Sequence, residues 1–392
     1  MRVLVAAAYF EPAFEYGGPV TVIAEGCRAL ARAGVSVTVF TTTANGAGEL
    51  EAPVGQPVNV GGIETWYFGR RSPRGYFYSP AMAAELRRRA ADFDLLHVHG
   101  LWCHTNLAVR RAALRAGVPY VATLHGGLDP EMMRKGWLKK RVYWGACERR
   151  NLDAASALVA LTEEERRQVE ARKVRAPVAV IPHGLDGSQY AETPPRALLR
   201  DLHPSLVSAP YVLFLGRLHP KKGVELLLAA LPTVLSHAPD LRLVVAGTGE
   251  APYEAALRSA GARLGEGRVL FVGHVGGDTK RALLAHALAF CLPSRSEGLP
   301  AACLEALFSR TPVVISRACH LPEVATEGAG FVVDRTPDAI AQAVVQLAAD
   351  GELQTRMAAQ ARVYALRDFE GQVIAQRTLA LYHRVAASRR AQ

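Results

Sequence analysis

The chain has 392 residues, half of them apolar, which is too long for a single hydrophobic core and predicts two globular domains. No apolar run approaches the roughly 18 residues of a membrane-spanning helix, and the first residues form a strand pattern, so we expect a cytoplasmic protein. The 46 basic and 36 acidic residues give a net charge of +10, which favours anionic partners. The six cysteines lack Cys-x-x-Cys spacing, which favours buried thiols over disulfides or zinc.

The first half alternates short apolar strands with helical patterns. Arg2 to Ala8 is typical of a strand, Gly17-Gly18-Pro19 of a glycine loop, and Val20 to Ala33 of an amphipathic helix. Further strands are predicted at residues 35–42, 95–98, 120–124, 157–161 and 178–181. Short buried strands that alternate with helices predict a doubly wound α/β domain, whose ligands gather at the carboxyl ends of the strands.

The apolar pattern lapses through residues 186–210, which contain Pro194-Pro195 and Pro204 and are predicted to be a linker. A second alternating set follows, with strands expected at 212–215, 241–246, 269–272, 289–292, 312–315 and 331–333. Helical patterns at 337–350, 352–366 and 371–385 end the chain. We therefore expect two doubly wound domains, at residues 1–190 and 191–370.

The stretch from Leu292 to Pro312 carries the most specific signal. A strand ends in a Pro-Ser turn, Glu297-Gly298-Leu299-Pro300 follows, and an Ala/Leu-rich helical pattern contains Glu305. Pro300 suits the first helical turn, which leaves nearby amides free to bind an anion such as phosphate. Glu297 then lies in the loop and Glu305 about a turn and a half into the helix. Two carboxylates are thus expected to flank a phosphate-sized site.

A second motif, Gly216 to Gly223, spans the first strand end and helix start of the second half. Its Arg217 and Lys222 could neutralise a diphosphate, so no metal ion is expected. Lys221 between them is expected to be solvated. The segment Gly247-Thr248-Gly249 lacks the third glycine of a dinucleotide-binding motif, so it indicates only a loop near a nucleotide.

These strings, with Pro-Val-Val-Ile after the helix, resemble family 4 (group 1) of the retaining glycosyltransferases. The resemblance covers almost the whole chain and is stronger in the second half. It implies the GT-B architecture, in which two Rossmann-like domains face each other across a central cleft, and a last helix, within residues 371–392, that packs back on the first domain. It also implies that a sugar moves from a nucleotide-diphosphate sugar to a hydroxyl of a glycan or lipid-linked acceptor, in polysaccharide or glycolipid synthesis. No metal cofactor is implied.

The resemblance assigns roles residue by residue. Glu297 would contact donor-sugar hydroxyls, and His125, within Thr123 to Gly127, would reach the same sugar; these are the catalytic candidates. For His125 a turn or core position is the plain alternative. The candidates for donor binding are the phosphate-binding side chains Arg217 and Lys222, the phosphate-binding amides of Gly298 and Leu299, the ribose-binding Glu305, Gly273 and Val275 beside the base, and Gly17 and Gly18 beside the diphosphate. For Gly17 and Gly18 a tight turn, and for Gly273 and Val275 plain packing, remain alternatives.

Two further patterns are not expected to bind metal. Asp92-Phe93-Asp94 has the Asp-x-Asp spacing of metal-dependent glycosyltransferases of another fold, but here it introduces a strand. His97, His99 and His104 could approach one another, yet no cysteine or carboxylate lies at ligand spacing, so packing and loop roles are favoured.

Two departures from the family pattern stand out: Arg310 replaces a common glycine and His183 a common asparagine. Neither is expected to touch the catalytic candidates, although Arg310 could alter the end of its helix. A basic segment, Arg134 to Arg150 with Lys135, Lys139, Lys140 and Arg141, favours docking to an anionic inner membrane surface rather than to nucleic acid.

Two other functions stay open at this point. One is a GT-B relative that epimerises, phosphorylyses or hydrolyses sugars, and the other is a non-catalytic protein that binds sugar nucleotides or nucleic acid. Donor and acceptor specificity is expected to lie in loops such as residues 61–80, so neither the donor base and sugar nor the acceptor and linkage follows from these motifs.

Overall fold

The computed structural model describes residues 1–134 and 136–390, which form two compact α/β units. The first unit comprises Met1–Leu185 and Gly371–Gln392, and the second comprises Asp186–Glu370. Lys135 of the basic segment and residues 391–392 of the predicted last helix lie outside the described residues.

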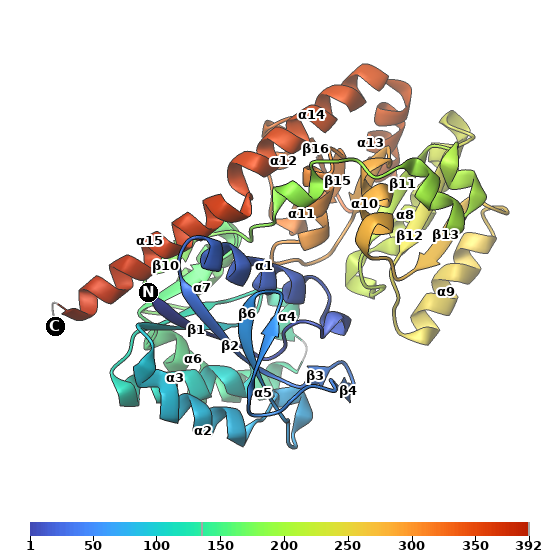
Figure 1. Ribbon diagram of the computed structural model, residues 1–392. Coiled ribbons are helices and arrows are strands. Elements are labelled where there is room, and N and C mark those ends of the chain that lie inside the picture. Colours follow the sequence, from blue (N-terminus) through green and yellow to red (C-terminus); the bar gives the residue numbers. More distant parts are fainter. Residues whose placement is uncertain (135, 391–392) are drawn as a thin grey trace. The chain divides into compact units, whose positions relative to one another are not determined.

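The first unit is built on a single large sheet with helices on both faces (Figure 1). Its strands are β1 (Arg2–Ala7), β2 (Ser36–Thr42), β5 (Pro57–Val60), β6 (Ile63–Phe68), β7 (Leu95–His99), β8 (Tyr120–Thr123), β9 (Ala157–Ala160) and β10 (Val178–Val180), and the short β3 (Ala44–Asn45) and β4 (Gly48–Glu49) pair separately. The sheet order is β10-β9-β8-β7-β1-β2-β6-β5, parallel except for the edge strand β5. The order reverses between β1 and β7, which marks the switch point where doubly wound sheets bind ligands.

The helices of the first unit close two apolar layers. They are α1 (Gly18–Arg32), α2 (Pro80–Arg89), α3 (His104–Ala116), α4 (Pro130–Arg134), α5 (Trp137–Tyr143), α6 (Arg149–Asp153), α7 (Glu163–Ala171) and the C-terminal α15 (Gly371–Arg390). One layer contains side chains of α1 and α15, and the other contains side chains of α2 and α3. Tyr382 of α15 is fully buried, and each such large side chain contributes about 1.5–3 kcal/mol. The C-terminal helix therefore belongs to the core of the first unit.

The second unit has a fully parallel sheet of six strands. They are β11 (Tyr211–Leu215), β12 (Arg242–Ala246), β13 (Val269–Gly273), β14 (Ala289–Leu292), β15 (Val313–Ser316) and β16 (Gly330–Val333). The order β13-β12-β11-β14-β15-β16 is the Rossmann order 3-2-1-4-5-6, with its switch point between β11 and β14. The helices are α8 (Val224–His237), α9 (Ala251–Ala262), α10 (Gly277–Ala285), α11 (Ala301–Phe308), α12 (Glu323–Thr326), α13 (Pro337–Ala349) and α14 (Gly351–Asp368).

The prediction that residues 61–80 form a loop is partly wrong, because this region contains strand β6. Ile63, Thr65 and Tyr67 are buried whereas Glu64 is exposed, which is the alternation of a half-buried strand. β6 pairs in parallel with β2 and antiparallel with β5. The pattern and its aromatic residues could have indicated a strand.

Candidate functional site

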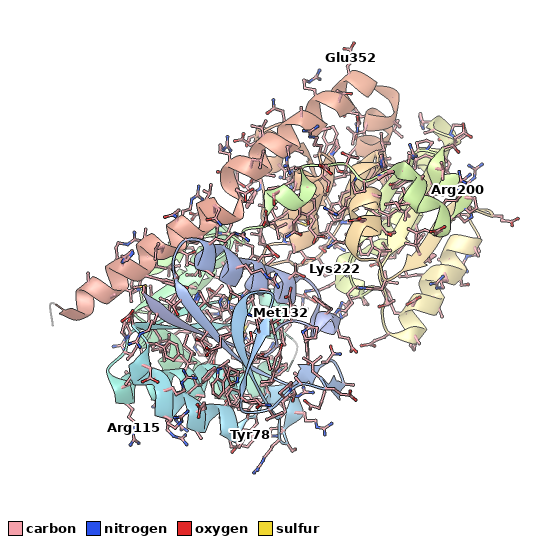
Figure 2. The ribbon with its side chains drawn as sticks, in the orientation of Figure 1. Tyr78, Arg115, Met132, Arg200, Lys222 and Glu352 are labelled. Atoms are coloured by element: carbon pink, nitrogen blue, oxygen red, sulfur yellow. The ribbon has the colours of Figure 1, made fainter. Side chains whose placement is uncertain are left out.

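In the second unit, the loops after β11 and β14 lie at the switch point and pack tightly against each other. Gly223 ends the first loop in the left-handed region, with φ of 76°, and an added Cβ would lie 2.4 Å from the carbonyl oxygen of Pro293. The amide of Arg295 donates to the carbonyl of Lys221 at 2.6 Å. This backbone-to-backbone packing fixes Lys222, labelled in Figure 2, at the carboxyl edge of the sheet.

Lys222 and Glu297 form an ion pair across this switch point. The Lys222 Nζ lies 2.7 Å from Glu297 Oε1, and Glu297 is only 8% exposed. Ser294 Oγ donates to the same carboxylate oxygen. Burial by itself would raise the pKa of Glu297, but the charges of Lys222 and Lys221 and the hydrogen bonds from Lys222 and Ser294 outweigh it, so the pKa is lowered. Glu297 is therefore ionised at neutral pH.

Lys221 was predicted to be solvated, and this is only partly correct. It is half-buried, and its charge is the second cation that lowers the pKa of Glu297. The tight turn at Pro220–Lys222 brings both lysines close to the carboxylate. Two adjacent cations thus face one buried anion.

Glu305 lies in α11 and forms a second ion pair that the motifs did not indicate. Lys280 Nζ, from α10, lies 2.8 Å from Glu305 Oε1, and Glu305 is 7% exposed. Lys280 is the fourth residue of the helix that follows β13. The sequence signal for this pair was a lysine in the first turn of a helix that follows a strand. Only the fold shows which carboxylate this lysine contacts.

The start of α11 offers free amides beside these charges. Helix α11 begins at Ala301, and Pro300 precedes it as the cap residue, so its predicted place in the first turn is wrong by one position. No side chain caps this helix. Within the described part of the chain, the amides of Gly298 and Leu299 donate no backbone hydrogen bond. Such amides at a helix start suit an anion.

The other candidates of the second unit lie at or just beyond the ends of β11 and β13, the two strands that flank β12. Arg217 is exposed after β11 and forms no ion pair with any described residue. Gly273 ends β13 with φ of 70°, its carbonyl accepts from the amide of Gly247 at 2.6 Å, and Val275 is buried. A Cβ at Gly247 would lie 2.0 Å from the carbonyl oxygen of Gly216, so these loops approach as closely as glycine allows. Arg217, Gly273 and Val275 therefore follow strands that end at the edge of the sheet where Lys222 also lies.

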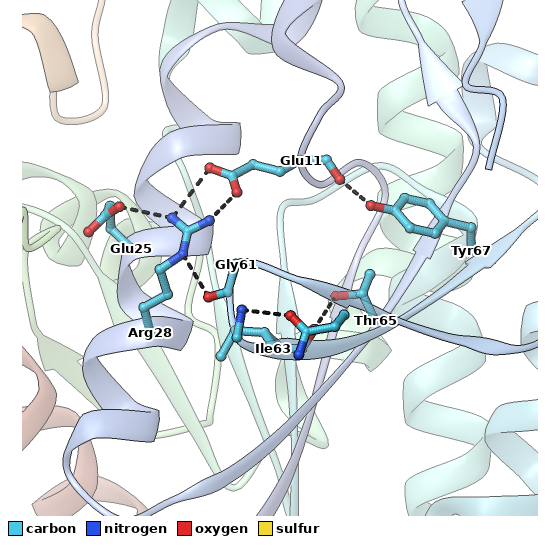
Figure 3. Close-up of polar contacts among 9 residues, drawn as sticks. Glu11, Glu25, Arg28, Gly61, Ile63, Thr65 and Tyr67 are labelled. Carbon is cyan, nitrogen blue, oxygen red and sulfur yellow. Dashed lines mark hydrogen bonds and ion pairs between the residues drawn. The ribbon is translucent and has the colours of Figure 1, made fainter. Parts of the chain in front are cut away.

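In the first unit, Gly17 and Gly18 open α1 after the loop that follows β1. Gly17 has φ of 73°, and no side chain caps the helix. Arg28 of α1 forms an ion pair with Glu11, and the Tyr67 hydroxyl donates to the Glu11 carbonyl (Figure 3). The loop before the glycines is thereby tied to both α1 and β6.

His125 follows β8 and lies in a cluster of imidazoles. It has φ of 52°, and its Nε2 lies 2.9 Å from His99 Nδ1. Its Nδ1 is buried and has no hydrogen-bond partner among the described residues. Burial lowers the pKa of His125 to about 4. The ring stacks on His183, with centroids 5.1 Å apart, so the expectation that His183 touches no catalytic candidate was wrong. Both loops leave the same edge of the sheet, but the sequence does not reveal that the strands before them, β8 and β10, lie only two positions apart.

The residues considered for metal have structural partners. Asp94 accepts from a backbone amide of β1 at 2.7 Å, and Asp92 lies 3.6 Å from the last arginine of α2. His97 contacts Tyr382 at 2.6 Å and Thr123 at 2.8 Å through its two ring nitrogens. In residues 1–134 and 136–390 no group of three or more histidine, cysteine or acidic side chains is arranged to hold a metal. The expectation of a metal-independent site stays a prediction.

Solved structures share this architecture along nearly the whole chain. HepE of Anabaena in complex with UDP and glucose matches with a TM-score of 0.76 and 21% identity, over 97% of this chain and 99% of that one. Sucrose-phosphate synthase of Thermosynechococcus elongatus matches with a TM-score of 0.79 and 19% identity, over 98% and 99%. The chain therefore has the fold of the GT-B glycosyltransferases, as predicted.

Sequence comparison gives the family. The model for Glycosyltransferase Family 4 matches residues 16–189, and that for Glycosyl transferases group 1 matches residues 199–364. A GDP-mannose-dependent alpha-(1-6)-phosphatidylinositol monomannoside mannosyltransferase of Mycolicibacterium smegmatis is 30% identical over 303 residues, 74% of this chain and 77% of that protein. Alpha-maltose-1-phosphate synthase of the same organism is 30% identical over 335 residues, 78% and 84% of the two chains. The chain belongs to the family 4 (group 1) glycosyltransferases.

Proposed function

We propose that the protein transfers a sugar, with retention of anomeric configuration, from a nucleotide-diphosphate sugar to a hydroxyl of a glycan or lipid-linked acceptor. The observation that carries this proposal is the buried Lys222–Glu297 pair at the switch point of the second unit, beside the uncapped start of α11. An ammonium group has three donors, and the contact with Glu297 uses one. The remaining donors can bind phosphate oxygens and neutralise the diphosphate as it leaves.

The other candidates have complementary roles in this proposal. Arg217 supplies a second, planar cation to the diphosphate, and the amides of Gly298 and Leu299 bind a phosphate oxygen. Glu305, oriented by Lys280, accepts from the ribose hydroxyls. Gly273 and Val275 bind the base through their backbone, and Gly17 and Gly18 keep their predicted role at the diphosphate. The two side-chain cations take the place of a divalent ion.

Glu297 and His125 are proposed to act on the sugar. Glu297 accepts hydrogen bonds from donor-sugar hydroxyls on the face opposite the leaving group. His125 is neutral at pH 7 because burial lowers its pKa to about 4, so it serves as a hydrogen-bonding group rather than as a counter-charge. The departing phosphate accepts the proton of the acceptor hydroxyl. Catalysis then depends on positioning and on charge stabilisation.

The test starts with the donor. UDP-glucose and GDP-mannose, the donors named for proteins similar to this one, are compared in a thermal-shift assay, since a ligand that binds the native state raises the melting temperature. Nucleotide release is then measured with and without candidate acceptors. Release that requires an acceptor supports transfer, whereas full turnover without one favours a hydrolysing relative.

Variants locate the site on the second unit. Lys222→Gln and Glu305→Gln should lose most turnover, on the order of a hundredfold for a group that stabilises developing charge. Arg258→Gln is the control, because Arg258 is exposed and pairs with Glu254, four residues earlier in α9 of the same unit. Equal losses in all three variants would contradict the assignment.

We further propose that the protein is cytoplasmic and docks peripherally to an anionic membrane surface through α4 and α5. In α5 the apolar Trp137, Leu138 and Val142 are 60%, 59% and 66% exposed, and Lys139 and Arg141 are exposed beside them. Each well-placed cation contributes about 1 kcal/mol at an anionic surface, and the aromatic and aliphatic side chains can enter the headgroup region. None of the described helices is long and apolar enough to cross a bilayer.

Vesicle sedimentation tests the docking proposal. The protein should bind vesicles that contain anionic phospholipid and should bind neutral vesicles much less. Trp137→Ser with Val142→Ser should weaken binding while the net charge stays constant, and Leu114→Ser, on another exposed apolar side chain of the first unit, is the control. Equal binding to both kinds of vesicle would exclude an anionic docking surface.

A further inference from the structure

A separate pocket of about 410 Å³ lies between α2 and α3 of the first unit. One stripe of each helix lines it, at spacings of three, four or seven residues that place side chains on one face. The lining includes Pro80, Ala83 and Arg87 from α2 and His104, Ala108 and Arg111 from α3. Ala83 and Ala108 contribute only methyl groups to the lining. None of the donor-binding candidates lines this pocket.

Two arginines, Arg87 and Arg111, line the pocket. Arg87 and Arg111 each follow the first residue of their helix by seven positions, roughly two turns. Neither forms an ion pair with any residue in the described ranges, whereas the neighbouring Arg88 and Arg89 pair with acidic side chains of α2 and its extension. Two guanidinium groups that line one pocket repel each other. An anion with several oxygens relieves this repulsion and can accept hydrogen bonds from both groups.

The other end of the pocket is aromatic. Tyr78, labelled in Figure 2, packs edge-on against His104 with centroids 4.8 Å apart, and Tyr76 also contacts this ring. Burial, and then the charge of Arg111, lowers the pKa of His104, so the ring is neutral at pH 7. The Tyr76 hydroxyl lies 2.7 Å from the hydroxyl of Tyr143 at the end of α5. The aromatic end therefore adds no charge, suits an organic group, and contacts the helix that carries the exposed apolar side chains.

We propose that this pocket binds a phosphate ester, with the phosphate between Arg87 and Arg111 and the esterified group against Tyr76 and Tyr78. Two planar guanidinium groups match the several oxygens of a phosphate better than the two oxygens of a single carboxylate. The volume is within the range of small-molecule sites. The proposal does not depend on the proposed transfer reaction, because it concerns a different set of residues and is tested by binding alone.

Calorimetry on the full chain tests the proposal with two probes. Phenyl phosphate, a monoester that keeps three terminal phosphate oxygens, supplies the phosphate ester, and inorganic phosphate supplies the free anion. The ester is expected to bind at least about tenfold more tightly, because only it can use the aromatic end. Absence of ester binding overturns the proposal, and equal affinity for the two probes assigns the pocket to free phosphate and overturns the ester assignment.

Matched variants locate the binding. The double variant Arg87→Gln/Arg111→Gln should weaken ester binding by at least about tenfold. The control Arg88→Gln/Arg115→Gln removes two charges from the same two helices, but neither residue lines the pocket, so affinity should change by less than about twofold. Equal losses of ester affinity in both double variants would show that only the net charge matters and would overturn the assignment of the site.

A third variant keeps every charge. Ala83→Leu narrows the pocket from the α2 side. It should weaken ester binding by at least about tenfold while the melting temperature stays near that of the parent protein. Ester binding that survives this substitution unchanged would also overturn the assignment.

Discussion

Replacing Lys222 by glutamine removes the main counter-ion of a buried carboxylate. The Lys222 Nζ lies 2.7 Å from Glu297 Oε1, and the two side chains are 18% and 7% exposed. Breaking a buried pair from one side costs about 3–5 kcal/mol. We expect a loss near the lower end, about 3 kcal/mol at pH 7, because Lys221 still faces the carboxylate.

The loss of unfolding free energy should depend on pH, and the ionisation of Glu297 decides in which direction. In the parent chain the folded-state pKa of Glu297 is lowered, so the pair stabilises the fold above the unfolded carboxyl pKa, about 4.3, and this contribution is lost as pH falls through the folded pKa. In the variant, burial dominates and raises the pKa, so protonation relieves the buried charge as pH falls. The difference between the two proteins should be largest at neutral pH and should shrink toward pH 4.

The assay must report the second unit. All four tryptophans, Trp66, Trp102, Trp137 and Trp144, lie in the first unit, so intrinsic fluorescence does not follow unfolding of the second. Amide hydrogen exchange in β11 and β14 gives the opening free energy of the affected sheet directly. The pair of the exposed Arg258 with Glu254 in the same helix provides the control, and Arg258→Gln should cost less than about 1 kcal/mol. A loss below about 1 kcal/mol for Lys222→Gln, unchanged between pH 7 and pH 5, would refute the reasoning.

Three further outcomes are expected. Arg310 has φ of 59°, so Arg310→Gly should raise the unfolding free energy by about 0.5–1 kcal/mol, measured by hydrogen exchange in α11, and a decrease would show that the arginine is not strained. His183→Asn removes the ring that stacks on His125 and admits water, so the His125 pKa should rise from about 4 toward 6.5 in an NMR titration, whereas an unchanged value would place the cause elsewhere. EDTA should leave acceptor-dependent turnover intact, and a loss that Mg²⁺ or Mn²⁺ restores would contradict neutralisation by Arg217 and Lys222.

Buried parallel strands are easily predicted because both faces of the sheet are covered and each strand forms an apolar run. β14 was predicted at its observed bounds, Ala289–Leu292, and the other parallel strands of the second unit within a residue or two. The same regularity placed Lys222 and Glu297 after strands that turned out to be neighbours at the switch point. The positions of these two residues could therefore be predicted from the motifs and the strand pattern, before any side-chain contact was known.

What the sequence missed depends on contacts between distant elements. Lys280 meets Glu305 from a different helix, and His183 meets His125 from a loop that follows a strand two positions away in the sheet. Neither pairing has a fixed spacing along the chain. β6 was missed for another reason, because it alternates buried residues with the exposed Glu64 and the half-buried Trp66 and does not form the continuous apolar run of the other parallel strands.

Both units contain parallel strands in the order 3-2-1-4-5-6, extended in the first unit by β5 and β10, but the residues at and beside their switch points differ in chemistry. In the second unit the side chains are charged, and Lys222 keeps Glu297 ionised in a buried position. In the first unit they are imidazoles whose pKa values burial lowers, so His99 and His125 are neutral at pH 7. A neutral imidazole with a buried, unpartnered Nδ1 is suited to a hydroxyl of the sugar and adds nothing to charge neutralisation. In the proposed reaction the counter-charge for the diphosphate comes from Arg217 and Lys222, and the histidines, which are already neutral at pH 7, position the sugar without adding charge.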